Sequence, residues 1–188
     1  MTYIDDQIIE KKTFTSEEIF DTEFDNCRFY DCNLNNINLS GIVFSECRFE
    51  NCDLSMSKLT DTAFKKVKFI NCKLMGLHFE DCNKFILSFE FLNCTIDLSS
   101  FYALKLNQTN FKNCSIKEAD FIDCDLSSVL FDECNLRGAL FENTILKNTD
   151  FRTAYNFSID PDINKLQKTK FSRDTLAGLL TKYSIIVE

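Results

Sequence analysis

The chain has 188 residues and a formal net charge of −8, with one histidine, one proline, four glycines and no tryptophan. This negative charge argues against binding of nucleic acid through a basic surface, and no apolar run approaches the ~18 residues that a membrane-spanning helix needs. The acidic start of the chain does not resemble a signal sequence, so we expect a single-domain cytoplasmic protein with no membrane contact and no direct contact to nucleic acid.

The first segment, residues 1–23, has apolar residues at a five-residue spacing: Ile4, Ile9, Phe14 and Ile19. Neither the 3.6-residue period of a helix nor the two-residue period of a strand fits this spacing. The same spacing continues downstream, so we expect this segment to form the first coil of a solenoid or a capping strand over its end.

The second segment, residues 24–152, keeps the five-residue spacing with a single break. Every fifth position is Phe, Leu or Ile: Phe24, Phe29, Leu34, Leu39, Phe44, Phe49, Leu54, Leu59, Phe64, Phe69, Leu74 and Phe79, then Phe91, Ile96, Phe101, Leu106, Phe111, Ile116, Phe121, Leu126, Phe131, Leu136, Phe141, Leu146 and Phe151. A second column, two residues earlier in each repeat, is mostly Cys, Thr, Ser, Ala or small aliphatic residues. Two residues of every five therefore point inward, which is typical of a stacked repeat protein.

Longer motifs recur every twenty residues within the same segment. Phe24-Asp-Asn-Cys27 aligns with Phe44-Ser-Glu-Cys47. This recurrence predicts four repeats per coil, with successive coils about 4.8 Å apart. Between Phe79 and Phe91 the spacing is twelve residues instead of ten. We expect this two-residue insertion within 80–90 to bulge at a coil corner, as a tolerated bulge or as a functional loop.

The repeating unit is a small residue, a polar residue, Leu or Phe, and two further polar residues. This unit resembles that of the pentapeptide-repeat family, and the resemblance covers residues ~20–152 by the solenoid interpretation. The resemblance implies an all-β solenoid, namely a right-handed quadrilateral β-helix of pentapeptide repeats. It is specific for the fold and says little about function.

The third segment, residues 153–188, departs from the repeat, and we expect a loop around Pro161, a helix and a short strand. Ser172 is a suitable N-cap for a helix over residues 173–183, and residues 185–187 suit a final strand. This α-helical tail should cap the last coil, and its apolar residues predict a dimer contact. The candidate interface residues are Leu176, Leu179, Leu180, Tyr183, Ile185 and Val187. The tail is similar to that of the quinolone-resistance (Qnr-like) gyrase-binding branch of the family, whose members dimerise through this end.

The ten cysteines all fall in the inward column, and none has C-x-x-C spacing. Packing explains each of them, because Cys is a compact apolar filler, whereas a metal site would need converging thiolates. We therefore expect free thiols and neither metal nor cofactor. His78, the single histidine, should point outward beside Phe79. Without a nucleophile–base pair or a phosphate-binding loop, the sequence predicts no enzyme activity.

One stretch of the outward surface is acidic and has no Lys or Arg until Arg137. Its members are Glu118, Asp120, Asp123, Asp125, Asp132 and Glu133. In the gyrase-binding relatives an acidic rod is thought to imitate DNA, and a site built for phosphates also accepts regularly spaced carboxylates. The resemblance thus implies a DNA mimic that binds DNA gyrase or topoisomerase IV and protects it from quinolones or toxins.

Two other interpretations of the charged surface stay open. The chain is alternatively an interaction scaffold for an unrelated protein partner, or its charges simply keep the rod soluble. Arg28, Arg48 and Lys68 lie twenty residues apart and predict a basic ladder. A basic ladder that interrupts the acidic surface would favour the scaffold over the DNA mimic.

Overall fold

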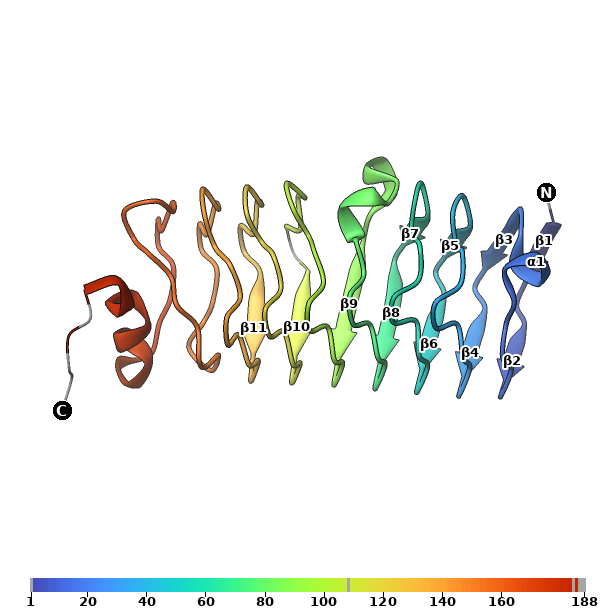
Figure 1. Ribbon diagram of the computed structural model, residues 1–188, viewed down its shortest axis with the longest axis horizontal. Coiled ribbons are helices and arrows are strands. Elements are labelled where there is room, and N and C mark those ends of the chain that lie inside the picture. The colour runs from blue at the N-terminus through green and yellow to red at the C-terminus, as the bar shows by residue number, and fades with distance from the viewer. Residues whose placement is uncertain (1, 108, 184, 186–188) are drawn as a thin grey trace.

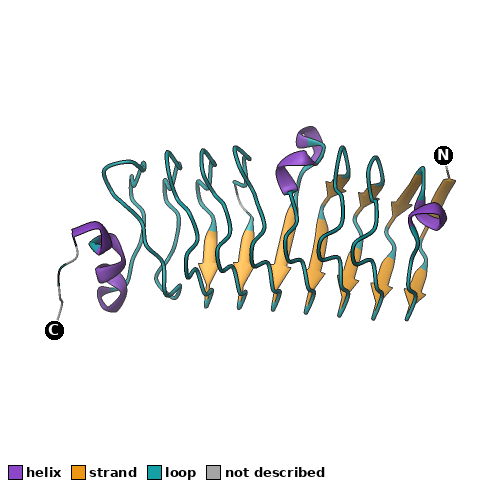
Figure 2. Cartoon of the chain, viewed as in Figure 1, coloured by secondary structure: helices purple, strands orange, loops and turns teal. Residues whose placement is uncertain are grey.

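The computed structural model describes residues 2–107, 109–183 and 185. The chain forms a rod of stacked coils, with β1 at one end and the short helices η3 and η4 at the other (Figure 1). Most of each coil is turn and irregular backbone, and the strands lie along one side of the rod and part of a second (Figure 2). In chain order the elements are β1 (Thr2–Asp5), β2 (Ile8–Glu10), α1 (Ser16–Ile19), β3 (Thr22–Asp25), β4 (Arg28–Tyr30), β5 (Val43–Ser45), β6 (Arg48–Glu50), β7 (Ala63–Lys65), β8 (Val67–Ile70), η1 (Phe79–Asp81), η2 (Lys84–Ile86), β9 (Phe89–Leu92), β10 (Asn110–Lys112), β11 (Leu130–Asp132), η3 (Arg173–Leu179) and η4 (Thr181–Tyr183).

The strands pair in parallel and in two sheets. One sheet has the order β1-β3-β5-β7 and the other the order β11-β10-β9-β8-β6-β4-β2. Phe29 is in register with Phe49, and Phe49 with Phe69, which confirms a coil of twenty residues. Phe69 is in register with Phe91, twenty-two residues on, because the insertion lies between them. The protein is therefore a parallel β-solenoid.

Each coil has four sides, because the backbone turns at nearly every fifth residue. At these corners φ is positive, as at Asn26, Asp31, Asn36 and Gly41 in the second coil. This left-handed conformation is unfavourable for most side chains and least so for Gly, Asn and Asp. A corner column of asparagines adds side-chain bonds between coils: Asn71 donates to Asn51 (3.1 Å), Asn93 to Asn71 (3.0 Å) and Asn113 to Asn93 (2.8 Å).

We name each side of the rod after its first central apolar residue from Phe24 onward. The Phe24 face contains Phe24, Phe44, Phe64, Leu106, Leu126, Leu146 and Leu166; the Phe29 face contains Phe29, Phe49, Phe69, Phe91, Phe111, Phe131, Phe151 and Phe171; the Leu34 face contains Leu34, Leu54, Leu74, Ile96, Ile116 and Leu136; and the Leu39 face contains Leu39, Leu59, Phe79, Phe101, Phe121 and Phe141. Apart from Leu166 and Phe171, which are partly buried, all of these side chains are buried. They fill the interior of the rod, so function is left to the outward residues.

Stacked phenylalanine rings run along the inside of the rod. On the Phe29 face they stack without a break from Phe29 to Phe171, with ring centroids 4.5–5.5 Å apart. A second stack on the Phe24 face ends at Phe64, and a new one on the Leu39 face begins at Phe79. The change coincides with the insertion, where Phe89 is buried and its ring lies 5.5 Å from that of Phe64.

The register of the coils changes between Asn83 and Phe89. Asn83 still bonds the preceding coil in the first register (Asn83 N to Thr62 O, 2.9 Å), and Phe89 is already in the second, opposite Val67. The residues between them include η2, which projects from the side of the rod (Figure 1). Phe85 in this turn is 99% exposed.

The first segment forms a complete coil. β1 pairs with β3 and β2 with β4, and α1 completes the coil on the Leu39 side. Thr15 caps α1 in a capping box with Glu18: the Glu18 backbone N–H donates to the Thr15 side chain (3.4 Å), and the Thr15 N–H to the Glu18 carboxylate (2.9 Å). These contacts are those of a first coil rather than of a single capping strand.

The repeats continue about one coil beyond the expected end at residue 152. Ile145 pairs with Lys165 and Asp150 with Lys170 in the same twenty-residue register. Pro161 interrupts the central column, but the second column persists as Ala154, Ile159, Asn164 and Thr169. The Asn164 side chain accepts from Thr144 N (2.9 Å) and donates to Phe141 O (2.8 Å), so a polar residue replaces an apolar one without leaving these backbone groups unpaired.

The tail differs from the α-helix expected over residues 173–183. It forms two 3-10 helices, η3 and η4, and Ser172 at the start of η3 makes no capping bond to the backbone. The Gly178 carbonyl accepts instead from Ile159 N (3.0 Å), and a Cβ at Gly178 would lie 2.6 Å from Phe157. The Gly178 carbonyl thus bonds to the last coil, whereas in an α-helix it would accept a hydrogen bond from within the helix. The strand expected at residues 185–187 lies outside the described residues, apart from Ile185.

Candidate functional site

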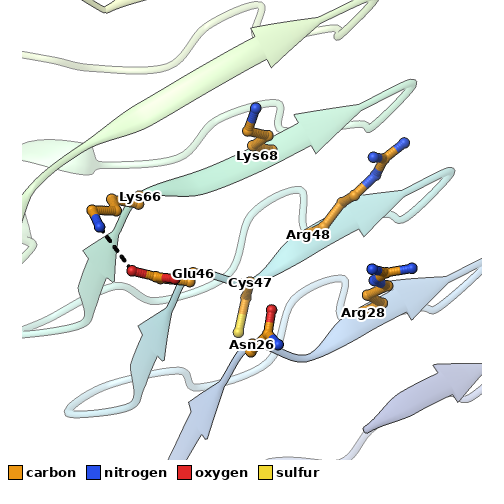
Figure 3. A pocket seen from close by; sticks show the side chains of 7 residues that line it. All are labelled: Asn26, Arg28, Glu46, Cys47, Arg48, Lys66 and Lys68. Carbon is orange, nitrogen blue, oxygen red and sulfur yellow. Dashed lines mark hydrogen bonds and ion pairs between the residues drawn. The ribbon is translucent and has the colours of Figure 1, made fainter. Parts of the chain in front are cut away.

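The surface of the rod has shallow hollows, and the described residues contain no group of three or more His, Cys, Asp or Glu side chains that could hold a metal ion. One hollow is lined by Asn26, Arg28, Glu46, Cys47, Arg48, Lys66 and Lys68 (Figure 3). His78 lies outward, 3.0 Å from Glu80. In the described part of the chain, no serine, threonine or cysteine side chain is hydrogen-bonded to His78. The candidate site is therefore the outer surface of the rod.

All ten cysteines are free and buried. Six of them occupy successive levels of one column: Cys32, Cys52, Cys72, Cys94, Cys114 and Cys134. The Cys72 thiol donates to Phe49 O (3.4 Å), a contact that recurs along the column. Burial raises the pKa of Cys47 and Cys124 to about 12. Such thiols stay protonated, so they fill space and are poor nucleophiles.

The six acidic residues that form one stretch in the sequence do not form one patch in the structure. Asp120 and Asp123 lie on the Leu39 face, and Glu118 lies at the corner before it. Asp125 lies on the Phe24 face, while Asp132 and Glu133 lie on the Phe29 face and its corner. The solenoid winds the stretch around most of one coil, so its members point in different directions.

Asp125 and Asp132 are also occupied by local contacts. Burial opposes ionisation of Asp125, but hydrogen bonds from Ser127 and Asn107 outweigh it, and the pKa of Asp125 is lowered. Asp132 accepts from Thr153 (3.0 Å) and lies 3.5 Å from the Lys112 ammonium. These two carboxylates are therefore less available to a partner than Asp123 and Glu118, which are exposed.

A larger acidic surface lies on the Leu39 face, which we call the acidic face. Its outward carboxylates are Asp61, Glu80, Asp81, Asp120, Asp123, Glu142, Asp160 and Asp162. From residue 58 to residue 163, the described outward positions of this face include one lysine, Lys58, and His78. Backbone bonds join its coils directly, as from Asp61 N to Asp81 O (2.8 Å) and from Asp123 N to Glu142 O (2.9 Å).

Most of the carboxylates on the acidic face have no cation beside them. Within the described chain, five of them make no ion pair: Asp61, Asp81, Asp120, Asp123 and Glu142. Lys182 pairs with both Asp160 (2.6 Å) and Asp162. The negative charge is therefore greatest between Asp61 and Glu142. It is scattered along the chain at intervals near twenty residues, so only a comparison of every twentieth position would have predicted it.

The basic ladder lies on the Phe29 face, two sides around the coil from the acidic face. Arg28, Arg48 and Lys68 are in direct register on neighbouring strands (Figure 3). Arg48 pairs with Glu50 (2.5 Å) and Lys68 with Glu90 (2.7 Å), while the Arg28 guanidinium makes no ion pair among the described residues. The ladder is thus largely neutralised and does not interrupt the acidic face.

The residues expected at a dimer interface divide into two groups. Leu179 packs against the core at the end of the rod. The exposed group consists of Leu176, Leu180, Tyr183 and Ile185. Val187 lies outside the described residues. The tail thus presents apolar side chains to solvent, and the dimer stays a prediction.

No helix in the described part of the chain has the length and apolar character needed to cross a membrane.

Comparisons with known proteins agree with this architecture. The family model described as pentapeptide repeat region matches residues 22–97 and 86–155. Trypsin-treated QnrB1, a plasmid-mediated fluoroquinolone resistance protein, is 17% identical, with 100% of both chains covered and a TM-score of 0.53. HetL, a pentapeptide repeat protein involved in heterocyst differentiation regulation from the cyanobacterium Nostoc sp. strain PCC 7120, is 13% identical over 90% of this chain and 88% of its own, with a TM-score of 0.46. No curated protein matches the chain.

At these identities the likeness to solved structures concerns the fold, and the family match spans well over half of the chain. The chain therefore belongs to the pentapeptide repeat family.

Proposed function

We propose that this chain is a non-enzymatic DNA mimic that binds DNA gyrase or topoisomerase IV and protects it from quinolones or toxins. The observation that carries the proposal is the acidic face, with carboxylates that make no ion pair within the described chain, such as Asp120, Asp123 and Glu142. The choice of partner is supported by the likeness to QnrB1, which is named a fluoroquinolone resistance protein.

The physical basis is charge complementarity. A protein site for duplex DNA places Lys and Arg against phosphates that occur once per ~1.7 Å of helix axis. The acidic face offers carboxylates on coils that are about 4.8 Å apart. This lower charge density should still speed association, because complementary fields mainly raise the on-rate. The binding should weaken steeply with salt.

The position of the basic ladder favours the DNA mimic over the scaffold. Arg28, Arg48 and Lys68 would weaken mimicry if they lay among the carboxylates, but they belong to the Phe29 face. One observation favours the scaffold: the coil around Phe101 carries no carboxylate on the acidic face, where Ser100, Tyr102 and Ala103 occupy the outward positions. A scaffold for an unrelated protein is therefore the second candidate.

Dimerisation through the tail belongs to the same proposal. Leu176, Leu180 and Tyr183 are 45%, 37% and 57% exposed at the end of the rod. A second copy would cover these side chains, because apolar groups on neighbouring turns favour self-association. Two rods joined at this end would form one longer acidic body in the cytoplasm.

A DNA gyrase supercoiling assay with and without a quinolone tests the proposal. The wild-type chain should form a complex and protect the enzyme, and the triple variant Asp120→Asn, Asp123→Asn, Glu142→Gln should lose most of this protection. The control is Asp132→Asn with Glu133→Gln, which removes two negative charges from another side and should protect like wild type. If the chain forms no complex with gyrase, does not inhibit it and does not protect it at micromolar concentration, the proposed partner is eliminated.

A further inference from the structure

The acidic face also carries apolar side chains in its middle. Tyr102 and Leu140 are 46% and 48% exposed, and Ile122 between them is half-buried. The three lie on successive coils: Ala103 N, which follows Tyr102, donates to Ile122 O (3.0 Å), and Leu140 pairs with Asp120. They therefore interrupt the carboxylates with a short apolar surface.

The projecting turn η2 extends this apolar surface at the edge of the face. Phe85 is 99% exposed and lines a hollow together with Ala103, the neighbour of Tyr102, and with the two lysines Lys84 and Lys105. The turn is tied to the acidic face, because Asn83 donates to the Asp61 carboxylate (3.0 Å) and accepts from Phe85 N (3.2 Å). Figure 2 shows the turn standing out from the otherwise even side of the rod. We call Phe85, Tyr102, Ile122 and Leu140 the apolar strip.

The charges around the apolar strip indicate what would cover it. Asp120, Asp123 and Glu142 surround Ile122 and Leu140 and have no cation partner in the described chain. Interaction with the Asp123 carboxylate raises the pKa of Tyr102. A purely apolar partner would have to desolvate these carboxylates at a cost. A partner with Lys or Arg around an apolar cleft would pair with the carboxylates and cover the apolar side chains.

We infer that the apolar strip is the anchor by which this chain holds a protein partner whose contact surface combines an apolar cleft with surrounding Lys and Arg side chains. The inference deepens the proposed function and rests on it for the identity of the partner. Carboxylates give the encounter its speed and orientation, whereas buried aromatic and aliphatic anchors carry most of the binding energy at protein interfaces. Duplex DNA has no counterpart to the strip.

Two synthetic peptides test the inference without the proposed partner. One is a cationic amphipathic peptide of Lys and Leu, and the other has the same length and charge with Ser in place of Leu. Wild type should prefer the Leu peptide by about tenfold in isothermal titration calorimetry, and Tyr102→Ser with Leu140→Ser should abolish the preference. Phe85→Ser should reduce it.

The matched control is Tyr155→Ser with Leu130→Ser, which removes side chains of similar exposure (45% and 38%) from other faces. This control should keep the preference for the Leu peptide, and circular dichroism should show all variants folded. Equal binding of the two peptides to wild type, or the same loss in both double variants, would overturn the inference.

The same variants separate this inference from the proposed function when DNA gyrase is the probe. If the chain distinguishes the peptides but forms no complex with gyrase, the apolar anchor is supported and the proposed partner is refuted. If gyrase binding is unchanged by substitution of Tyr102 and Leu140 but is weakened by removal of the carboxylates, the proposed function is supported and the anchor is refuted.

Discussion

Truncation of an interior ring of the longest phenylalanine stack, Phe111→Ala, tests the physical basis of the fold. Phe111 is fully buried, with its ring stacked on Phe91 (5.0 Å) and Phe131 (5.1 Å). Removal of a buried Phe side chain costs about 3–5 kcal/mol, and each aromatic pair adds about 0.5–1.5 kcal/mol beyond its buried area. Because two stacked pairs are lost in a rod that cannot easily collapse, we expect a loss near the upper end, about 4–5 kcal/mol.

Equilibrium unfolding in urea measures this loss, and two variants calibrate it. Phe111→Leu should cost about 1–1.5 kcal/mol, because the solenoid already accepts aliphatic residues at central positions such as Ile116. Phe171→Ala should cost less than half as much as Phe111→Ala, because Phe171 is partly buried and stacks on one neighbour, Phe151 (5.5 Å).

The shape of the unfolding curve gives a second readout. Each coil contacts only its neighbours, so loss of a central ring should weaken the coupling between the two halves of the rod and lower the apparent m value. A loss below about 2 kcal/mol for Phe111→Ala, or equal losses for Phe111→Ala and Phe171→Ala, would refute the stacking argument.

Four further predictions concern the thiols, a strained corner and the tail. The pKa of Cys47 and Cys124 is about 12 in the folded chain and near 8.5 when unfolded, so folded stability should be full below about pH 8.5 and fall as pH rises toward 12; urea midpoints that stay constant across this range would contradict it. All ten thiols should resist a thiol reagent in the native chain and titrate after unfolding, and fewer than ten after unfolding would mean that some are bonded. Leu98 has a φ of 61° and is 58% exposed, so Leu98→Asn should raise the free energy of unfolding by about 0.5–1 kcal/mol. A lower midpoint temperature of thermal unfolding for this variant would argue against strain at Leu98. Leu180→Glu with Tyr183→Glu should convert the expected dimer to a monomer in sedimentation equilibrium, and a wild-type monomer would remove the predicted interface.

The interior of this protein could be predicted closely from the sequence. Columns such as Phe29, Phe49 and Phe69 depend on a local rule, two inward residues in every five, and the same rule places the cysteines inside. The insertion near Lys84 was predictable because it shifts every later column by two residues. The end of the repeats was predicted about one coil too early, because Asn156 and Pro161 interrupt the central column while the backbone pairing continues to Lys170.

The sequence by itself therefore determined the solenoid, its coil length and the buried set, because stacking repeats the same local choice along the chain. Only the tertiary structure decided which outward residues share a surface. Asp61 and Asp81, and likewise Asp123 and Glu142, are about twenty residues apart in sequence and become neighbours because each coil returns to the same side after twenty residues, or twenty-two at the insertion. Acidic residues that are close in sequence, such as Asp120 and Asp125, lie on different sides for the same reason, since the chain turns a corner every five residues.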